Sequence, residues 1–474
     1  MTSPRAGDSR DRVLALLPRG EAIRNFVYTD ALRLTASHVD LAVASVVPND
    51  EIRRLLVEQF GDFDVIEDRP AHRMSGALRD AIDVAHGRWL WSEAAQERWR
   101  RRDAEVDERG SRLKHSLRRA GTRPFANRRG LELLDTTYER LARRFEVSDD
   151  DRALLERVGP SLVFNASHVH GHAAAPIVAA ARALQVTTAA FVFSWDNLTS
   201  QGRVIPRYDA FLVWTDDLRT ALLRQYPRID PELVFVTGTP QFDSHFDDRL
   251  AWTRSDYCDR LGLDPERPIV LYTTGMPNHM PGEPDIVEEL ADRMTSLDRQ
   301  PQLVVRVYAK DRSNRFDDLR ARRPDISFPP VAWDANWLTP MPEDTALWSN
   351  MLRHADVGVN VASTVSLELC MFDRPVVNIG YNPRSVATSV IDYSRYYRFD
   401  HYSPVVASGA VQVAPNVDAA LEFVAVALAD PASRSNERRA LLREFFGDVL
   451  DGHAADRVAS TLAALARNQH RAAV

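Results

Sequence analysis

The sequence predicts an α/β protein with two doubly wound parallel sheets in tandem. Short apolar runs bounded by turn residues alternate with helical patterns, which is typical of a parallel sheet covered by helices. This alternation runs through the first half of the chain and restarts after residue 247. The chain has 474 residues, 45% of them hydrophobic, which is enough for two domains that each have a core.

The first half contains apolar runs that are predicted to be buried strands. They span residues 11–17, 39–47, 161–166, 187–193, 209–214 and 233–238. Helical patterns lie between several of them, for example at residues 173–184. Residues 1–246 are therefore expected to form one Rossmann-like domain.

The second half repeats the pattern, with predicted strands at residues 267–275, 301–309, 355–361 and 374–380. Residues 247–474 are expected to form the second domain. The tail from 433 to 470 has a helical pattern and is expected to cross back to the first domain. In such folds ligands bind at the carboxyl ends of the strands, so a central cleft faced by both sheets is the expected site.

Charge and composition limit the class of partner. The net charge is -7, which argues against nucleic acid as a partner. No segment approaches the roughly 20 apolar residues that a membrane span requires, so a cytoplasmic protein is expected. The two cysteines, Cys258 and Cys370, provide no disulfide framework or metal knuckle and are expected to be small core residues.

One segment is strongly basic. From Glu97 to Arg129 there are twelve Lys or Arg and five Asp or Glu, in an otherwise acidic chain. One interpretation is a solvated helical face. The other is a docking surface for an anionic lipid or a phosphate-rich acceptor, helped by Trp99, which would place the protein at the inner face of the membrane.

A strand that ends in Ser363 and Thr364 turns directly into a short helix. The first N–H groups of a helix have no partner inside it and, with the helix dipole, favour an anion such as phosphate. Ser363 is predicted as the N-cap. Glu368 lies one turn beyond Thr364 on the same face, where its carboxylate can accept hydrogen bonds from ribose hydroxyls. The alternative is a capped helix with an exposed acid.

Several segments carry a family resemblance. In the second half they are "LYTTGMPN" (271–278) and "HADVGVNVASTVSLELCMFDRPVVNIGY" (354–381), and the first half contains "FSWDNL" (193–198) and "GTPQFD" (238–243). In this order they resemble the GT-B glycosyltransferases, whose fold of two Rossmann-like domains is shared with UDP-N-acetylglucosamine 2-epimerases and CDP-glycerol glycerophosphotransferases. The first half is similar to bacterial surface-carbohydrate transferases of this fold. The resemblance implies an acceptor domain followed by a nucleotide-sugar donor domain.

The resemblance also implies a donor site in the second domain. Its residues would be Thr274, Gly275, Arg306, Lys310, Ser363, Thr364 and Glu368. Arg306 and Lys310 stand where relatives often carry an Arg-x-His-Pro segment, and either would neutralise phosphate charge. The His-Pro pair is missing here, which argues against the hypothesis of a polyol-phosphate transferase. Alternatively, Arg306 pairs with an acid at the end of the sheet.

Inverting transfer needs a general base near the acceptor hydroxyl, and three loops of the first domain offer one. The candidates for the base are Asp196, His170 and Glu21. Trp195 and Arg24 are the expected acceptor-binding residues. For each candidate the alternative is a hydrogen bond that orders its loop.

The histidines at 168, 170 and 172 follow a predicted strand, as zinc ligands do in some hydrolases. The metallo-β-lactamase pattern needs Asp two residues after its second His, whereas His172 stands there, so no metal is expected. The chain also lacks a G-x-x-x-x-G-K-S/T loop and a G-x-G-x-x-G turn, so neither an NTPase nor a dehydrogenase is indicated.

The expected function is that of a metal-independent glycosyltransferase without a cofactor. Its substrates would be a nucleotide-sugar and a hydroxyl of a glycan, lipid-linked or secondary-metabolite acceptor. The alternatives are a UDP-sugar 2-epimerase, a CDP-polyol phosphotransferase and a noncatalytic nucleotide-binding partner. The sequence leaves open the donor base and sugar, the acceptor, the stereochemical course and the oligomeric state.

Overall fold

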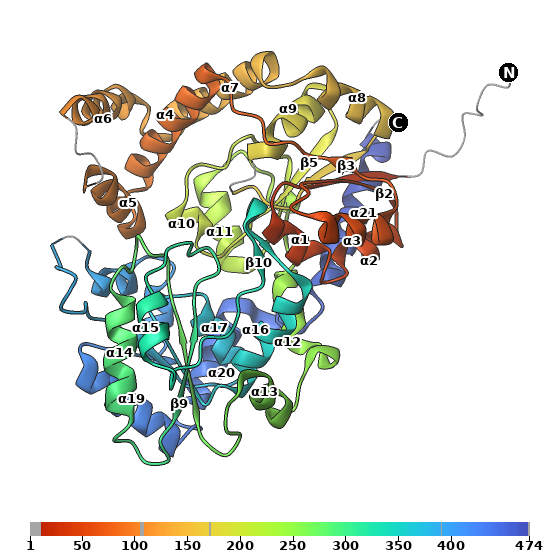
Figure 1. Cartoon of the computed structure of the whole chain (residues 1–474). Coiled ribbons are helices and arrows are strands. Elements are labelled where there is room, and N and C mark those ends of the chain that lie inside the picture. Colours follow the sequence, from red (N-terminus) through yellow and green to blue (C-terminus); the bar gives the residue numbers. More distant parts are fainter. Residues whose placement is uncertain (1–10, 105–108, 170–171, 390, 473–474) are drawn as a thin grey trace. The chain divides into compact units, whose positions relative to one another are not determined.

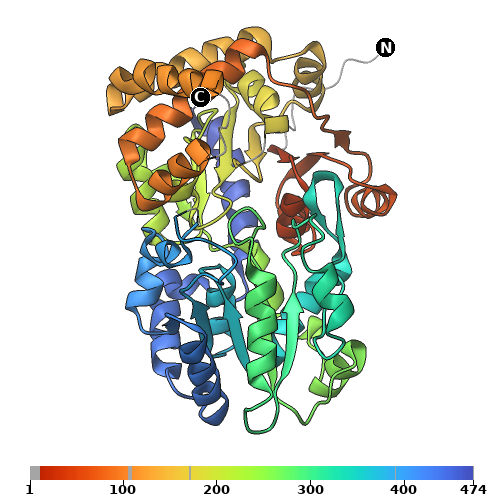
Figure 2. The same cartoon turned by 60° about the vertical axis from the view of Figure 1, so that its left-hand side comes forward.

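The computed structural model describes residues 11–104, 109–169, 172–389 and 391–472. The chain forms two compact units, and each contains a parallel sheet (Figures 1 and 2). The first unit comprises residues 1–243, 334–339 and 449–474, and the second comprises residues 244–333 and 340–448.

The first unit is built on a seven-stranded sheet in the order β3-β2-β1-β4-β5-β6-β7. Its strands are β1 (Arg12–Leu17), β2 (Asp40–Ser45), β3 (Asp64–Val65), β4 (Leu162–Asn165), β5 (Thr187–Phe191), β6 (Ala210–Val213) and β7 (Val234–Val236). All neighbouring strands run parallel. The strand order reverses between β1 and β4, so the loops that follow these two strands flank the position where doubly wound folds bind ligands.

Helices make up most of the rest of the first unit (Figure 1). They are α1 (Gly20–Phe26), α2 (Ala31–Ala36), α3 (Asp50–Phe60), α4 (Arg73–Leu90), α5 (Glu93–Ala104), α6 (Arg109–Thr122), α7 (Arg128–Phe145), α8 (Asp149–Val158), α9 (Ala175–Ala183), α10 (Asn197–Ser200), α11 (Asp216–Gln225) and α21 (Ala454–Ala472). Helix α21 packs on α2, β1 and β4. Its first turn is tied to Asp243, whose carboxylate accepts the N–H groups of Ala454 (3.1 Å) and Ala455 (2.8 Å).

The second unit is built on a five-stranded parallel sheet in the order β14-β13-β12-β8-β9. Its strands are β8 (Ile269–Thr273), β9 (Gln302–Arg306), β12 (Val357–Asn360), β13 (Val376–Ile379) and β14 (Val411–Ala414). A separate ribbon pairs β10 (Trp333–Asp334) with β11 (Thr339–Pro340). The order of the main sheet reverses between β8 and β12, again the position at which such sheets bind ligands.

The helices that follow along the chain are α12 (Asp243–Phe246), α13 (Arg254–Leu261), α14 (Glu283–Met294), α15 (Asp317–Arg322), α16 (Pro342–His354), α17 (Val365–Met371), α18 (Ser403–Ala407), α19 (Val417–Ala429) and α20 (Ser435–Phe446). Helices α14 and α19 pack together, and α17 packs between α16 and α20. The apolar core that α14 and α19 form with the sheet includes Val270, Val305, Ile286 and Val424.

The predicted fold class is confirmed: the chain is an α/β protein with two doubly wound parallel sheets. Each predicted strand is present, although each is shorter than its apolar run. The strands β3, β10, β11 and β14 were not predicted. β3, β10 and β11 have only two residues each, too few to show a period, and β14 (Val411–Ala414) contains Gln412 and is only partly buried. No helix in the described part of the chain combines the length and hydropathy that a membrane span requires.

Candidate functional site

The turns that follow β8 and β12 lie at the position where the strand order of the second sheet reverses. Thr273 and Asn360, the last residues of these strands, are direct neighbours in the parallel register. The predicted donor residues Thr274 and Gly275 follow β8, and Ser363 and Thr364 follow β12. The fold therefore brings both predicted phosphate-binding turns to the same edge of this sheet.

Glu368 is held by two donors from elsewhere in the second unit. Its Oε2 accepts a hydrogen bond from the indole Nε1 of Trp348 (2.8 Å) and another from Nε2 of His245 (3.0 Å). The carboxylate is largely buried, with 12% of the side chain exposed. It is therefore not the exposed helical acid of the alternative interpretation, and its orientation is defined by Trp348 on α16 and His245 on α12.

A buried polar network anchors α17 to the strands beneath it. The Ser366 hydroxyl lies 3.1 Å from Oδ1 of Asn360, and the same oxygen accepts a hydrogen bond from Nδ2 of Asn378 (3.0 Å). Tyr402 reaches both Ser366 (2.8 Å) and Asn378 (2.9 Å) through its hydroxyl. Because all four side chains are buried and bonded to one another, the position of Glu368 one turn along α17 is well determined.

The predicted N-cap is wrong by one residue. Helix α17 begins at Val365, and its N-cap is Thr364, which has a helical backbone conformation and no side-chain capping bond. The Ser363 hydroxyl still accepts the N–H of Val365, at 3.3 Å. Ala362, in the preceding turn, has a positive φ of 27°.

Arg306 lies in a buried ion pair. Its Nη2 donates to both carboxylate oxygens of Asp344, at 2.7 Å each. Its Nη1 donates to the carbonyl of Pro330 (2.8 Å). Asp344 also accepts from Nε1 of Trp333 (2.9 Å). This is the arrangement of the alternative interpretation, a pair with an acid at the end of the sheet. A role for Arg306 in donor binding stays a prediction.

The loop after β8 is closed by Glu283, the first residue of α14. Its carboxylate accepts the N–H of Gly275 (2.8 Å), the hydroxyl of Tyr272 (3.2 Å) and Nη2 of Arg315 (3.1 Å). A Cβ at Gly275 would lie 2.1 Å from Sδ of Met280, so any larger residue there would require the Met280 side chain to move. The amide predicted to approach the diphosphate therefore donates to Glu283 in this structure.

Glu283 is expected to make stability depend on pH. Burial raises the pKa of this carboxyl group to about 7, although Arg315 opposes the shift. The folded protein then keeps a proton that the unfolded chain releases above about pH 4.5. The stabilisation of the fold by protonated Glu283 is fully present below pH 4.5 and is lost as the pH rises to 7. Wild type should therefore lose roughly 1–3 kcal/mol relative to Glu283→Gln between pH 5 and 7.5.

Urea denaturation of both proteins across this pH range measures the difference. Glu266→Gln, at an exposed glutamate of the same unit, is the matched control and should parallel wild type. If the free energy of unfolding of wild type and of Glu283→Gln changes with pH in parallel, Glu283 does not change its protonation in this pH range.

Lys310 lies in the loop after β9, and Thr274 contacts this loop. Oγ1 of Thr274 accepts the N–H of Tyr308 at 2.8 Å, which joins the turn after β8 to that loop. Lys310 is half-buried, and its Nζ lies 6.0 Å from the ring centroid of Tyr308. Both residues are therefore at the carboxyl edge of the second sheet, and their role in donor binding stays a prediction.

In the first unit the predicted acceptor loops follow β1, β4 and β5. Glu21 is buried on α1 and forms an ion pair with Arg19, whose guanidinium lies 5.5 Å from the ring centroid of Phe193. Phe193 belongs to the loop after β5, so the loops after β1 and β5 meet here. Arg24 donates to Gln241 (2.8 Å) and Asn25 (2.9 Å).

Asp196 is half-buried at the start of α10. Its Oδ2 accepts the hydroxyl of Ser200 at 2.5 Å, and its backbone carbonyl accepts the N–H groups of Thr199 and Ser200. Trp195 is buried, with 7% of its surface exposed. Asp196 therefore orders its own short helix, and its role as a base and that of Trp195 in acceptor binding stay predictions.

The histidines after β4 have separate partners. Nδ1 of His168 lies 3.0 Å from the carbonyl oxygen of Phe191, and His172 contacts Arg79. His170 lies outside the described residues. A search over residues 11–104, 109–169, 172–389 and 391–472 finds no group of three or more His, Cys, Asp or Glu that could hold a metal ion.

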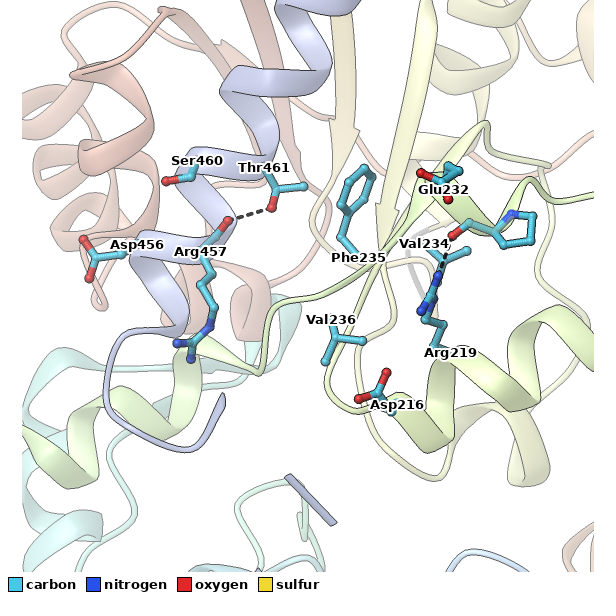
Figure 3. Close-up of a pocket in the computed structure, with 11 residues that line it drawn as sticks. Asp216, Arg219, Glu232, Val234, Phe235, Val236, Asp456, Arg457, Ser460 and Thr461 are labelled. Atoms are coloured by element: carbon cyan, nitrogen blue, oxygen red, sulfur yellow. Dashed lines mark hydrogen bonds between the residues drawn. The ribbon is translucent and has the colours of Figure 1, made fainter. Parts of the chain in front are cut away.

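A pocket of about 620 Å³ lies beside β7, the edge strand of the first sheet (Figure 3). It is lined by residues of α11, β7 and α21, including Asp216, Arg219, Phe235 and Arg457. The two arginines already donate to backbone carbonyls, Arg219 to Pro231 (3.0 Å) and Arg457 to Thr237 (2.9 Å). None of the predicted site residues lines this pocket.

Three of the residues that define the second-unit site were not predicted as site residues from the sequence. Trp348 and His245 orient Glu368, and Asp344 neutralises Arg306. His245 lies 123 residues before Glu368, and no spacing rule links positions that far apart. Asp344 sits in the first turn of α16, where an acid is expected for the helix dipole alone.

No protein-family model and no curated protein sequence matches the chain. Solved structures do match over almost its whole length. A UDP-GlcNAc 2-epimerase from Neisseria meningitidis, bound to UDP-GlcNAc, is 9% identical with a TM-score of 0.55 and covers 95% of this chain and 99% of its own. The UDP-GlcNAc 2-epimerase from Methanocaldococcus jannaschii is 12% identical with a TM-score of 0.51, covering 95% and 99%.

A third match, S. aureus MnaA solved with UDP, is 12% identical with a TM-score of 0.51 and covers 94% of each chain. Identities this low establish the fold and no activity. The chain has the GT-B-like two-domain fold of these epimerases.

Proposed function

We propose that the protein is a GT-B glycosyltransferase, which moves a sugar from a nucleotide-sugar donor to a hydroxyl of a glycan, lipid-linked or secondary-metabolite acceptor. The observation that carries the proposal is the placement of Glu368. Its carboxylate is mostly buried and fixed by Trp348 and His245 at the point where the strand order of the second sheet reverses. A fixed carboxylate there suits the two hydroxyls of a ribose.

In this proposal the second unit binds the nucleotide. Ser363 and Thr364 meet the diphosphate at the turn after β12, and Glu368 accepts from the ribose. Because Arg306 is already neutralised by Asp344, Lys310 is the residue we assign to the diphosphate charge. Binding through Thr274 and Gly275 requires Gly275 to exchange its bond to Glu283 for one to phosphate.

The chemistry needs a departing nucleotide diphosphate and an activated acceptor hydroxyl. Fixed donors stabilise the charge that develops on the diphosphate, and they do so without a metal ion in this mechanism. Asp196 of the first unit takes the proton of the acceptor hydroxyl. Asp196 is preferred over Glu21, because Glu21 is buried in an ion pair with Arg19.

A UDP-sugar 2-epimerase is the second candidate function. The observation that favours it is the match to epimerase structures over 95% of this chain and 99% of theirs. Such an enzyme would change the configuration of the sugar in a UDP-sugar without any acceptor.

One experiment separates these functions. The purified protein is incubated in EDTA with UDP-, GDP-, CDP- and dTDP-sugars, with and without a panel of acceptors, and both nucleotide and sugar products are analysed. We expect nucleotide release that requires an acceptor, because transfer consumes the hydroxyl. A new sugar epimer without acceptor would establish the epimerase. Binding without turnover would indicate a noncatalytic nucleotide-binding partner, and activity that EDTA abolishes and zinc or manganese restores would contradict the metal-free mechanism.

A further inference from the structure

We infer that α6 and the chain that follows it form a surface that docks on an anionic lipid bilayer. This surface consists of residues 113–129. The inference rests on the arrangement of α6 and is independent of the reaction proposed above.

Helix α6 has its polar side chains inward and its leucines outward. The positions that face its neighbours are His115, Arg118, Arg119 and Thr122, which follow the spacing of one helical stripe. Leu113 and Leu117 lie one turn apart on the other side and are 62% and 63% exposed. A helix that packs on a protein core has the reverse arrangement, so two outward leucines one turn apart indicate a binding surface.

Ion pairs hold the inner face in place. Arg118 pairs with Asp80 on α4 (3.1 Å), and Arg119 pairs with Asp103 on α5 (2.7 Å). The guanidinium of Arg119 also stacks on Trp99, 4.3 Å from the ring centroid. The helix therefore keeps its orientation on α4 (Figure 1), and Leu113 and Leu117 stay on the outside.

The charge of the surface identifies its partner. Residues 113–129 carry six Lys or Arg and no Asp or Glu, although the whole chain has a net charge of -7. Lys114, Arg123, Arg128 and Arg129 are exposed, and within the described parts of the chain none of them makes an ion pair. Anionic headgroups complement these cations.

The leucines distinguish a bilayer from other polyanions. A nucleic acid would use the cations alone, whereas a bilayer also takes up Leu113 and Leu117 at the boundary between headgroups and acyl chains. The exposed leucines and the exposed cations belong to one continuous segment of the chain. The segment has the composition of a helix that lies in the membrane interface.

The test is co-sedimentation of the full-length protein with vesicles of phosphatidylcholine, alone or with about one third phosphatidylglycerol. We expect binding to the anionic vesicles only, which weakens as salt is raised because exposed charges are screened over about 10 Å at 0.1 M and about 3 Å at 1 M. The double variants Leu113→Ser/Leu117→Ser and Arg128→Gln/Arg129→Gln should each lower the partition coefficient about tenfold.

Matched controls lie elsewhere on the first unit. Leu184→Ser removes another leucine that is 53% exposed, and Arg53→Gln/Arg54→Gln removes another exposed pair of arginines from a helix. Both control variants should bind like wild type. An equal loss in the controls and the α6 variants would overturn the assignment of the surface, as would the absence of binding to anionic vesicles at low salt.

A labelled cysteine gives a second readout. The native cysteines, Cys258 and Cys370, are buried, so a single Leu113→Cys variant can carry an environment-sensitive fluorophore. Its emission should shift to the blue on anionic vesicles, whereas the same label at Leu184→Cys should not respond. A blue shift at both positions, or an equal shift on a DNA duplex, would contradict a specific bilayer surface.

Discussion

Asp196→Asn is expected to lower the turnover number of the proposed transferase by about 10² to 10⁴, the usual effect of removing a general base. The asparagine amide has almost the same shape as the carboxylate, and its oxygen can still accept the hydroxyl of Ser200. The local fold should therefore be kept while the proton acceptor is lost. Donor binding, measured by calorimetry with the nucleoside diphosphate, should stay unchanged.

The control for this prediction is Asp217→Asn, at an exposed aspartate of α11 in the same unit. It should turn over like wild type. The melting temperature of Asp196→Asn should also match wild type. Near-normal turnover of Asp196→Asn would remove this residue from the mechanism, and a lower melting temperature with weaker donor binding would assign it a structural role.

Glu368→Gln should weaken binding of both the nucleoside diphosphate and the nucleotide-sugar by about tenfold or more. Hydrogen bonds from ribose hydroxyls to a carboxylate are charge-assisted, and losing one typically costs about 1.5 to 3 kcal/mol. The glutamine keeps the shape of the side chain, and its carbonyl oxygen can still accept from Trp348 and His245. The stability of the fold should therefore hardly change.

A 2′,3′-dideoxy nucleotide provides the discriminating measurement. It lacks the ribose hydroxyls, so wild type and Glu368→Gln should bind it almost equally. Glu343→Gln, at an exposed acid in the first turn of α16, is the matched control and should bind both nucleotides like wild type. If Glu368→Gln loses the same free energy with both ligands, Glu368 is not the ribose clamp and its bonds to Trp348 and His245 serve only the fold.

The second-unit site was only partly predictable from the sequence. The location of residues at the ends of predicted strands can be predicted, because parallel strands end at one edge of a sheet. For this reason Thr274, Ser363 and Thr364 lie together at the carboxyl edge of the second sheet. The partners of Arg306 and Gly275, Asp344 and Glu283, come from other elements and were not predicted.

For the basic segment, the sequence shows the charge and only the structure shows the orientation of α6. The excess of arginine and lysine is visible in the sequence, and it indicated a solvated face or an anionic partner. Only the packing of α6 on α4 shows that Arg118 and Arg119 point inward and Leu113 and Leu117 point outward. The helical period alone places these residues on opposite sides and does not say which side meets the protein.

The sequence by itself determined the α/β class, the tandem of two sheets and most of the strands, because the alternation of buried strands and amphipathic helices is a local property of the chain. It also determined that Glu368 follows Thr364 by one helical turn. Only the tertiary structure decided that Trp348 and His245 bond to Glu368 and that Asp344 neutralises Arg306. These contacts join residues up to 123 positions apart, and their geometry is set by how helices pack on the sheet rather than by any local preference of the backbone.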